Sequence, residues 1–222
     1  WDVWPDSAKL VPDLGPGLRP NVEAVLAKRP DLVIIYGSEE NRAAVDQLRA
    51  AGVAVVALKV DRIPQFLRAT LALGAATGMA ARARRVADTV SASLNRVRLQ
   101  TASLPRPRVY WHVWDEPTIT IGAGSYLNEL IEIAGGRNIY ADLKAPSPQV
   151  ALEDIARRDP EFVLAGPEGA RRLASEPGWQ AVGAVRRGRI LVVDTLLVGR
   201  PSVRLGEAAE AIAKLLHAVD PR

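Results

Sequence analysis

A set of aromatic side chains in this sequence could contact a large planar ligand. Tyr36 ends one apolar run and Trp114 follows another, and ligands of open α/β sheets bind beyond the carboxyl ends of the strands. Aromatic rings at that edge offer much contact area at little cost in conformational entropy. Packing in a core or at its rim is the alternative, and it is favoured for Trp111, which lies inside a predicted strand. The candidate ligand contacts are Trp1, Trp4, Tyr36, Trp111 and Trp114.

Polar candidates for ligand contact lie in two loops and one strand. Arg200 and Arg204 follow the last predicted strand, and their guanidinium groups could pair with carboxylates, amides or phosphate, or form surface ion pairs. The Gly-Ala-Gly-Ser turn at 122–125 opens a helix, so its N–H groups could hold an anion, or the turn could only connect strand to helix. His112 could ligate a metal through one imidazole nitrogen, although a single histidine in a strand is more often a buried packing residue.

The composition excludes several kinds of chemistry. The 222 residues include no cysteine and 2 histidines, which rules out disulfides, thiolate nucleophiles and a multi-histidine zinc site. No nucleophile elbow, P-loop or dinucleotide-binding glycine pattern occurs, and no spaced pair of carboxylates suggests a general acid and base. The 29 Lys and Arg residues are interleaved with 25 Asp and Glu, for a net charge of +4. We therefore predict neither an enzyme nor a protein that binds nucleic acid.

The order of apolar patterns predicts an α/β fold. Short β-branched runs are typical of parallel strands buried on both faces, and helical patterns separate them. The stretch 63–100 shows no strand pattern, and its second part, 80–100, would form a helix of roughly 30 Å. No apolar run approaches the length of a membrane span. Strands are predicted at 32–36, 53–60, 109–113, 119–121, 162–165 and 190–193, and further helices at 22–27, 41–50, 126–134, 152–158 and 203–219.

One pattern occurs twice, at an offset of 130 residues. The stretches 22–34 and 152–164 each place a glutamate, Glu23 or Glu153, in the first turn of a helix, followed by a proline, an acidic residue and an apolar strand. Chance similarity of two ordinary helix–strand units is the alternative to a duplication. We predict two similar Rossmann-like α/β lobes with parallel sheets, joined by a long rigid helix. The predicted parts are an N-terminal lobe at 1–62, linker helices at 63–104 and a C-terminal lobe at 105–222.

These patterns resemble the substrate-binding proteins of bacterial ABC importers for cobalamin, haem and iron-siderophores. The resemblance covers nearly the whole chain, and it is greatest toward the cobalamin-binding members because of Trp4-Pro5, the Pro-Ser-Pro-Gln-Val run at 146–150 and the Arg-x-Ser at 200–202. The other matching motifs are Asn-x-Glu at 21–23, Pro-Asp-Leu-Val-Ile at 30–34, Leu-x-x-x-Gly-Val-x-Val at 48–55, Pro-Arg-Val-Tyr at 107–110, Gly-x-Gly-Ser at 122–125, Ala-Gly-Gly-x-Asn at 134–138, Val-x-x-Glu at 150–153 and Arg-Pro-Ser-x-Arg at 200–204.

The resemblance implies a helical-backbone periplasmic binding protein, exported to the periplasm or cell envelope with its signal removed. Such a protein would capture a corrinoid, similar to vitamin B12, in the cleft between its lobes and deliver it to an ABC permease with its ATPase. Haem or a ferric siderophore is the alternative ligand, and an α/β enzyme is the alternative class. The implied protein is a monomer without an intrinsic cofactor, and cobalamin is its transported ligand.

Two further expectations follow from the resemblance. Matching glutamates of the family dock onto permease arginines, and Glu23 and Glu153 would take that role in addition to stabilising their helix N-termini. The family usually opens with a strand, a loop with Thr-Glu and a helix, and this unit is not found ahead of the first matching motif. We therefore expect either a fragment or a reduced first lobe.

Overall fold

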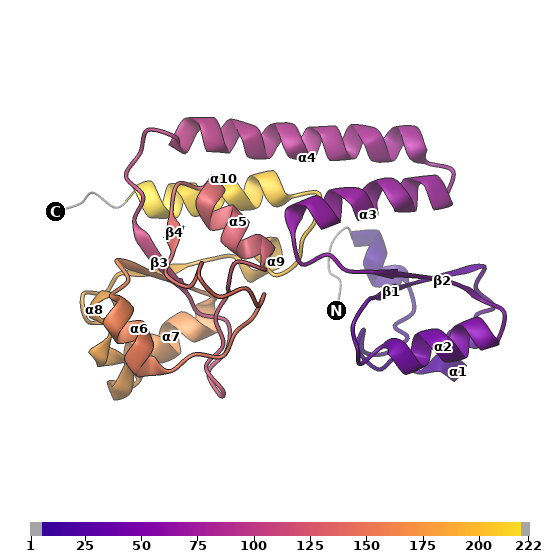
Figure 1. Cartoon of the computed structure of the whole chain (residues 1–222), viewed down its shortest axis with the longest axis horizontal. Coiled ribbons are helices and arrows are strands. Elements are labelled where there is room, and N and C mark those ends of the chain that lie inside the picture. Colours follow the sequence, from indigo (N-terminus) through magenta and orange to yellow (C-terminus); the bar gives the residue numbers. More distant parts are fainter. Residues whose placement is uncertain (1–5, 219–222) are drawn as a thin grey trace. The chain divides into compact units, whose positions relative to one another are not determined.

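The computed structural model describes residues 6–218 of the chain. The chain separates into two compact units, Trp1–Val60 and Asp61–Arg222, whose elements are labelled in Figure 1. The N-terminal unit contains a 2-stranded parallel sheet and the C-terminal unit a 4-stranded parallel sheet. Within residues 6–218 no helix is both long and apolar enough to cross a membrane.

The N-terminal unit is a strand–helix–strand segment with a long loop packed on it. The two strands run parallel from Leu32 paired with Ala54 to Tyr36 paired with Leu58. The apolar face of the connecting helix buries Val45 against the sheet, because its apolar side chains recur at helical spacing. The elements are η1 (Asp6–Leu10), α1 (Val22–Leu26), β1 (Leu32–Tyr36), α2 (Arg42–Ala50) and β2 (Ala54–Leu58).

The loop that precedes α1 is attached to the end of β1 by one buried amide. The Nδ2 of Asn41 donates to the carbonyl oxygens of Tyr36, at 2.9 Å, and Gly17, at 3.0 Å. Its Oδ1 accepts from the backbone N of Arg19 at 2.9 Å. Since Asn41 is fully buried, these bonds are shielded from water and hold the carboxyl end of β1 in place.

The C-terminal unit is built on a sheet with helices on both faces. Its strand order is β4-β3-β5-β6, with every neighbouring pair parallel. Figure 1 shows α4, α5 and α10 on one side of this sheet and α6, α7 and α8 on the other. The strands are β3 (Arg108–Trp111), β4 (Arg137–Asn138), β5 (Phe162–Ala165) and β6 (Ile190–Val192). The helices are α3 (Ile63–Ala76), α4 (Ala80–Thr101), α5 (Tyr126–Ile133), α6 (Leu152–Arg158), α7 (Pro167–Ser175), η2 (Pro177–Ala181), α8 (Gly183–Arg186), α9 (Thr195–Val198) and α10 (Leu205–His217).

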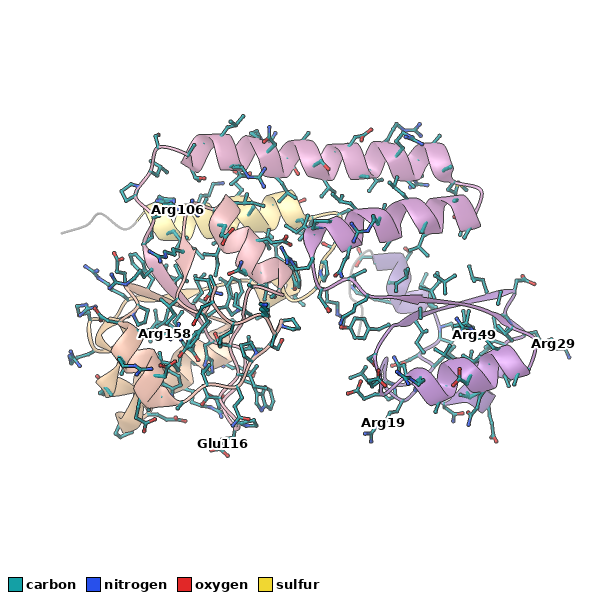
Figure 2. The ribbon with its side chains drawn as sticks, viewed as in Figure 1. Arg19, Arg29, Arg49, Arg106, Glu116 and Arg158 are labelled. Carbon is teal, nitrogen blue, oxygen red and sulfur yellow. The ribbon has the colours of Figure 1, made fainter. Side chains whose placement is uncertain are left out.

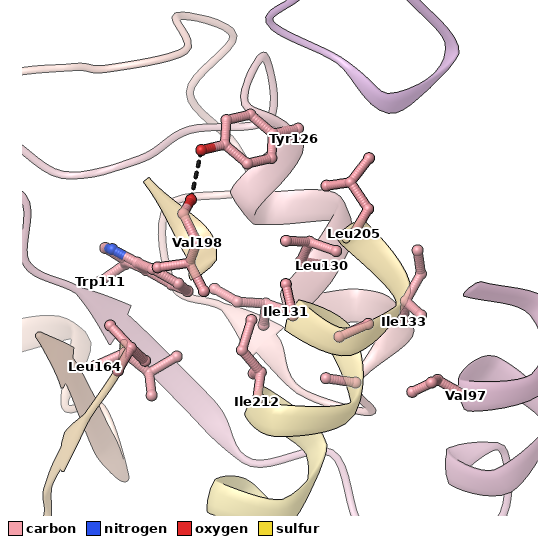
Figure 3. Packing of buried hydrophobic residues seen from close by; sticks show 14 of the residues in the cluster. Val97, Trp111, Tyr126, Leu130, Ile131, Ile133, Leu164, Val198, Leu205 and Ile212 are labelled. Carbon is pink, nitrogen blue, oxygen red and sulfur yellow. Dashed lines mark hydrogen bonds between the residues drawn. The ribbon is translucent and has the colours of Figure 1, made fainter. Parts of the chain in front are cut away.

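Alternate residues of the central strands enter two separate cores. Trp111 of β3 and Leu164 of β5 belong to the cluster that includes α4, α5 and α10, part of which Figure 3 shows. Tyr110 and Val163 belong to the cluster on the opposite face, with α6, α7 and α8. Side chains of a strand point alternately to its two faces, and both faces of this sheet are covered. The continuous apolar runs of the sequence are the result.

Small residues let the covering helices approach one another closely. A Cβ built on Gly206, in α10, would lie 2.1 Å from the Oγ of Ser93, in α4. A Cβ on Gly74, in α3, would lie 2.2 Å from the Cβ of Ala83 in α4. The 22 residues of α4 span about 33 Å and bury the stripe Val90, Leu94 and Val97.

The predicted repeat has the same local backbone in both copies. In each copy a short helix is followed by a non-glycine residue with positive φ, Arg29 at 49° or Asp159 at 42°. A proline comes next, and then a strand, β1 or β5. The left-handed Asp159 is the C-cap of α6, whereas Arg29, labelled in Figure 2, follows the right-handed C-cap Ala27 of α1.

One predicted strand is absent from the structure, and the structure contains helices that were not predicted. No strand forms at 119–121, where Ile119 makes only isolated bridges to Trp114 and Gln149, because the flanking prolines and glycines allow no longer ladder. The helix α7 was not predicted, and β6 is followed directly by α9. The predicted boundaries at 62/63 and 104/105 remain predictions, although α3 and α4 fall inside the second compact unit.

Candidate functional site

The C-terminal unit has a pocket of about 640 Å³ at one edge of its sheet. The residues around it follow the carboxyl ends of β3, β5 and β6, which is where open α/β sheets bind ligands. Trp111 ends β3, Gly166 follows β5 and Val193 follows β6. The full lining is Trp111, His112, Val113, Trp114, Asp115, Leu127, Gly166, Pro167, Glu168, Gly169, Arg171, Arg172, Val193, Thr195, Val198 and Gly199.

A tight turn after β3 carries the exposed aromatic ring of this pocket. The backbone N of Val113 donates to the carbonyl oxygen of Ile119 at 3.0 Å, and the N of Ile119 donates to that of Trp114 at 2.9 Å. The hydroxyl of Thr118 donates to the carbonyl of Asp115 at 3.0 Å. We call residues 112–119 the Trp114 turn. Its tryptophan is 61% exposed, a large apolar surface left open at the pocket.

His112 lies at the base of the Trp114 turn and is 5% exposed. Its Nδ1 lies 3.4 Å from the Tyr110 hydroxyl, and its Nε2 lies 3.0 Å from Oδ1 of Asp115. The edge of Trp179 packs on the ring at 5.4 Å between centroids. Burial lowers the pKa of His112, and it outweighs the opposing attraction of Asp115. The imidazole is therefore neutral at pH 7, with protein groups beside both nitrogens.

Asp115 connects the turn to α7. Its Oδ2 lies 3.0 Å from Nη1 of Arg172, while Oδ1 is buried and faces His112. The approach of Oδ1 to the imidazole is not aligned with a ring N–H bond, so that contact is mainly electrostatic. Neither Asp115 nor Arg172 was identified from the sequence. The only signal was the Gly-Pro at 166–167 after a strand, since proline is favoured at the first position of a helix.

The N-terminal unit has its own pocket, of about 480 Å³, at the carboxyl end of β1. Tyr36 lies at its edge and is 38% exposed. Most of the surrounding side chains are charged, and Arg42 pairs with Glu39 at 2.6 Å. The lining consists of Tyr36, Gly37, Ser38, Glu39, Glu40, Arg42, Val45, Asp46, Arg49, Ala57 and Lys59.

The structure distributes the predicted ligand contacts unevenly. Trp111 and Trp114 line the C-terminal pocket, but only Trp114 is exposed, because the Trp111 ring is 4% exposed and packs in a core. Arg200 and Arg204 lie beyond the residues that line that pocket. Arg204 pairs with Glu207 at 2.8 Å. The remaining two candidates, Trp1 and Trp4, lie outside the described residues.

The turn at 122–125 is closed by protein backbone. A Cβ on Gly122 would lie 2.3 Å from the carbonyl oxygen of Ala145, and one on Gly124 would lie 2.5 Å from that of Lys144. The N of Ala123 donates to the carbonyl of Leu143 at 2.7 Å. These contacts satisfy the turn internally, so it connects and positions α5 rather than presenting N–H groups to a ligand.

The two repeat glutamates are both exposed, one turn into short helices. Glu23 lies in α1, whose N-cap Asn21 accepts from the N of Ala24 at 3.0 Å, and Glu153 lies in α6. Among residues 6–218, no cation lies within ion-pair distance of either carboxylate. Within the same part of the chain, no group of three or more His, Asp or Glu side chains could hold a metal ion.

The comparison with known families supports this architecture. A profile of the periplasmic binding protein family matches residues 1–195. The chain belongs to this family. The cobalamin-binding protein of Halobacterium salinarum is 32% identical over 212 residues, which cover 89% of this chain and 56% of that protein. The chain thus spans little more than half the length of that relative.

Solved structures agree on the fold. A periplasmic haem-binding protein from Pseudomonas aeruginosa has a TM-score of 0.82 at 27% identity, covering 95% of this chain and 80% of its own. The periplasmic vitamin B12-binding protein of Vibrio cholerae has a TM-score of 0.82 at 22% identity, covering 97% and 85%. The predicted fold class and family are confirmed. These relatives are named as binding proteins and not as enzymes, in agreement with the prediction.

Proposed function

We propose that this protein is the ligand-binding component of an ABC importer and that its cargo is a corrinoid. The family supports the first part, and the cobalamin-binding relative from Halobacterium supports the second. Haem and ferric siderophores are the competing cargoes, because similar structures include a haem-binding protein and a protein of a Fe3+-hydroxamate transport system. The charges that line the pockets bear on the choice among these cargoes.

The balance of charge in the pockets is the observation that favours a corrinoid over haem. In the C-terminal pocket Arg171 and Arg172 are matched by Asp115 and Glu168, and His112 is neutral. The carboxamides around a corrin ring are uncharged and need hydrogen-bonding groups without net charge. Haem propionates are anionic, and a pocket suited to haem needs an excess of cations. A ferric trihydroxamate is neutral, because three monoanionic hydroxamates balance Fe3+, so the titration below distinguishes that cargo from a corrinoid.

The N-terminal pocket has the same balance. Its lining contains three acidic and three basic side chains, so neither charge is in excess. The acidic residues are Glu39, Glu40 and Asp46, and the basic residues are Arg42, Arg49 and Lys59. A phosphodiester, the one anionic group of cobalamin, would be met by Arg200 or Arg204, which we retain as proposed ligand contacts.

The exposed aromatic rings supply the apolar part of the proposed site. Tyr36 lines the N-terminal pocket, Trp114 lines the C-terminal pocket, and both residues are exposed. Truncation of such an anchor typically costs about 2 kcal/mol or more, which corresponds to roughly a 20-fold to 30-fold loss of affinity. Tyr36→Ala and Trp114→Ala should each weaken cyanocobalamin binding by that factor. Leu196→Ala is the matched control, since Leu196 is 75% exposed and lines neither pocket.

A competitive titration tests the proposal directly. Cyanocobalamin, haemin and a ferric hydroxamate are titrated separately into the protein, by calorimetry and by intrinsic tryptophan fluorescence. We expect cyanocobalamin to bind at least about tenfold more tightly than the other two ligands. Tighter binding of haemin or of the siderophore would overturn the corrinoid assignment and leave the importer class intact. Binding of none of the three would overturn the assignment of the class of cargo.

Delivery to the permease is the second part of the proposal. Glu23 and Glu153 are exposed, lie at equivalent positions of the repeat and have no cation beside them in residues 6–218. Carboxylates in this state can pair with arginines of a partner without breaking an existing ion pair. We infer a monomer in the periplasm or cell envelope that docks onto the permease through this pair.

A further inference from the structure

The carboxylate of Asp115 links the Trp114 turn to α7. Asp115 has one oxygen facing His112, at 3.0 Å, and the other facing Arg172 of α7, at 3.0 Å. Its own backbone carbonyl accepts from Thr118, which closes the turn. The exposed Trp114 is the preceding residue. A change at Asp115 therefore acts on the placement of that ring through the turn and through α7.

We propose that Asp115 is a positioning residue, which holds the Trp114 turn against α7 in the conformation that receives the cargo. The effect on cargo affinity rests on the proposed function, whereas the effect on the turn does not. A preorganised anchor binds more tightly because its ordering cost is met during folding.

Close packing restricts the orientation of the His112 ring. Trp179 packs on it, and Gly169 of α7 approaches so closely that an added Cβ would lie 3.0 Å from Cδ2. A bare Nε2 lone pair facing a carboxylate oxygen would be repelled, so we assign the proton of the neutral ring to Nε2. Nδ1 then accepts from the Tyr110 hydroxyl, which stays protonated because burial raises its pKa.

The charged groups that act on His112 come from two elements. Asp115, in the turn, favours the protonated ring, whereas Arg172, in α7, opposes it. Glu176, just after α7, favours protonation, and the neutral Tyr110 lies beside it on β3. Loss of the Asp115 charge removes the largest attraction and lowers the pKa of His112 further. A residue that only filled space would leave that pKa unchanged.

Two substitutions separate the two contacts of Asp115. Asp115→Asn keeps the shape but removes the charge, and Arg172→Gln removes the partner on α7 while leaving the contact between Asp115 and His112 in place. Arg172→Lys retains a cation and should restore the turn. Asp88→Asn is the matched control, because it makes the same change of group at an exposed residue of α4 that lines neither pocket.

Hydrogen exchange of the ligand-free protein reads the turn directly. In Asp115→Asn and Arg172→Gln we expect the amides of Val113 and Ile119 to exchange at least about tenfold faster, with those of β5 unchanged. Arg172→Lys and Asp88→Asn should exchange like the wild type. The His112 ring, followed by NMR, should titrate at lower pH in Asp115→Asn. Unchanged exchange of the turn amides in both Asp115→Asn and Arg172→Gln would overturn the proposal.

Cargo affinity then tests the link to function. Cyanocobalamin should bind Asp115→Asn and Arg172→Gln about tenfold more weakly, and Asp88→Asn as the wild type does. If the turn loosens and the affinity is unchanged, the positioning of cargo is refuted. If the wild type does not bind cyanocobalamin, the proposed cargo is wrong, while the exchange data still decide whether Asp115 holds the turn.

Discussion

Replacement of Asn138 by alanine should destabilise the C-terminal unit by about 3 kcal/mol. The Asn138 side chain is 2% exposed and makes three hydrogen bonds in the interior. Its Nδ2 donates to the carbonyl of Ile121 and to Oδ1 of Asn128, each at 2.9 Å. Its Oδ1 accepts from the backbone N of Tyr140 at 3.0 Å. Together these bonds attach β4 to the turn that begins α5.

The magnitude follows from the groups that alanine would leave without a partner. A buried donor or acceptor without a partner costs about 1–3 kcal/mol. The Oδ1 of Asn128 would lose its donor, and the nearby Glu132 carboxylate, which faces the Asn128 Nδ2 at 3.5 Å, cannot replace it because it only accepts. Counting about 1 kcal/mol for each of the three partners gives about 3 kcal/mol. For a unit of this size, that lowers the melting temperature by roughly 6–12 °C.

Urea unfolding and calorimetry of Asn138→Ala measure this loss. Asn95→Ala is the control, because Asn95 is exposed in α4 and alanine is the better helix former, so the change should be within about 0.5 kcal/mol of zero. A loss below about 1 kcal/mol in Asn138→Ala would refute the reasoning, since water would then replace the amide at almost no cost.

Three further predictions follow from other contacts. In Gly206→Val the new side chain would collide with Ser93, because a Cβ at residue 206 would lie 2.1 Å from the Ser93 Oγ. The resulting separation of α10 from α4 should lower the free energy of unfolding in urea by about 1–3 kcal/mol. An unchanged urea midpoint would contradict the close approach of the two helices. The double variant Glu23→Ala/Glu153→Ala should bind cyanocobalamin normally but lose salt-sensitive retention on the permease; normal retention would exclude docking through this pair. Burial lowers the pKa of His112 below its ordinary value of about 6.5. At pH values between the folded-state pKa and about 6.5, the unfolded chain therefore binds more protons than the folded protein does. The free energy of unfolding should therefore fall as the pH drops from about 6.5 toward the folded-state pKa and then stop changing on this account. His112→Gln should remove this contribution, and equal pH profiles of the two proteins would disprove it.

The sequence by itself determined the parts of the fold that depend on local patterns. The apolar runs that became β1, β3 and β5 are recognisable because both faces of a parallel sheet are buried. The repeat was also visible, as a glutamate, a proline, an acidic residue and an apolar run in both copies. The left-handed backbone of the residues before Pro30 and Pro160 appeared only in the structure. The same patterns also predicted that Tyr36 ends a strand and that Trp114 lies after one.

Only the tertiary structure decided which polar groups meet. Asp115 and Arg172 are far apart in the sequence and lie 3.0 Å apart because β3 and β5 are neighbours in the sheet. The turn at 122–125 was a candidate anion site until the backbone of 143–145 closed it. His112 was a candidate ligand for a metal, and its burial beside Tyr110 and Asp115 depends on the packing of α7. Spacing along a chain predicts the face on which a side chain lies, but contacts between distant segments depend on strand order and helix packing, which no local pattern encodes.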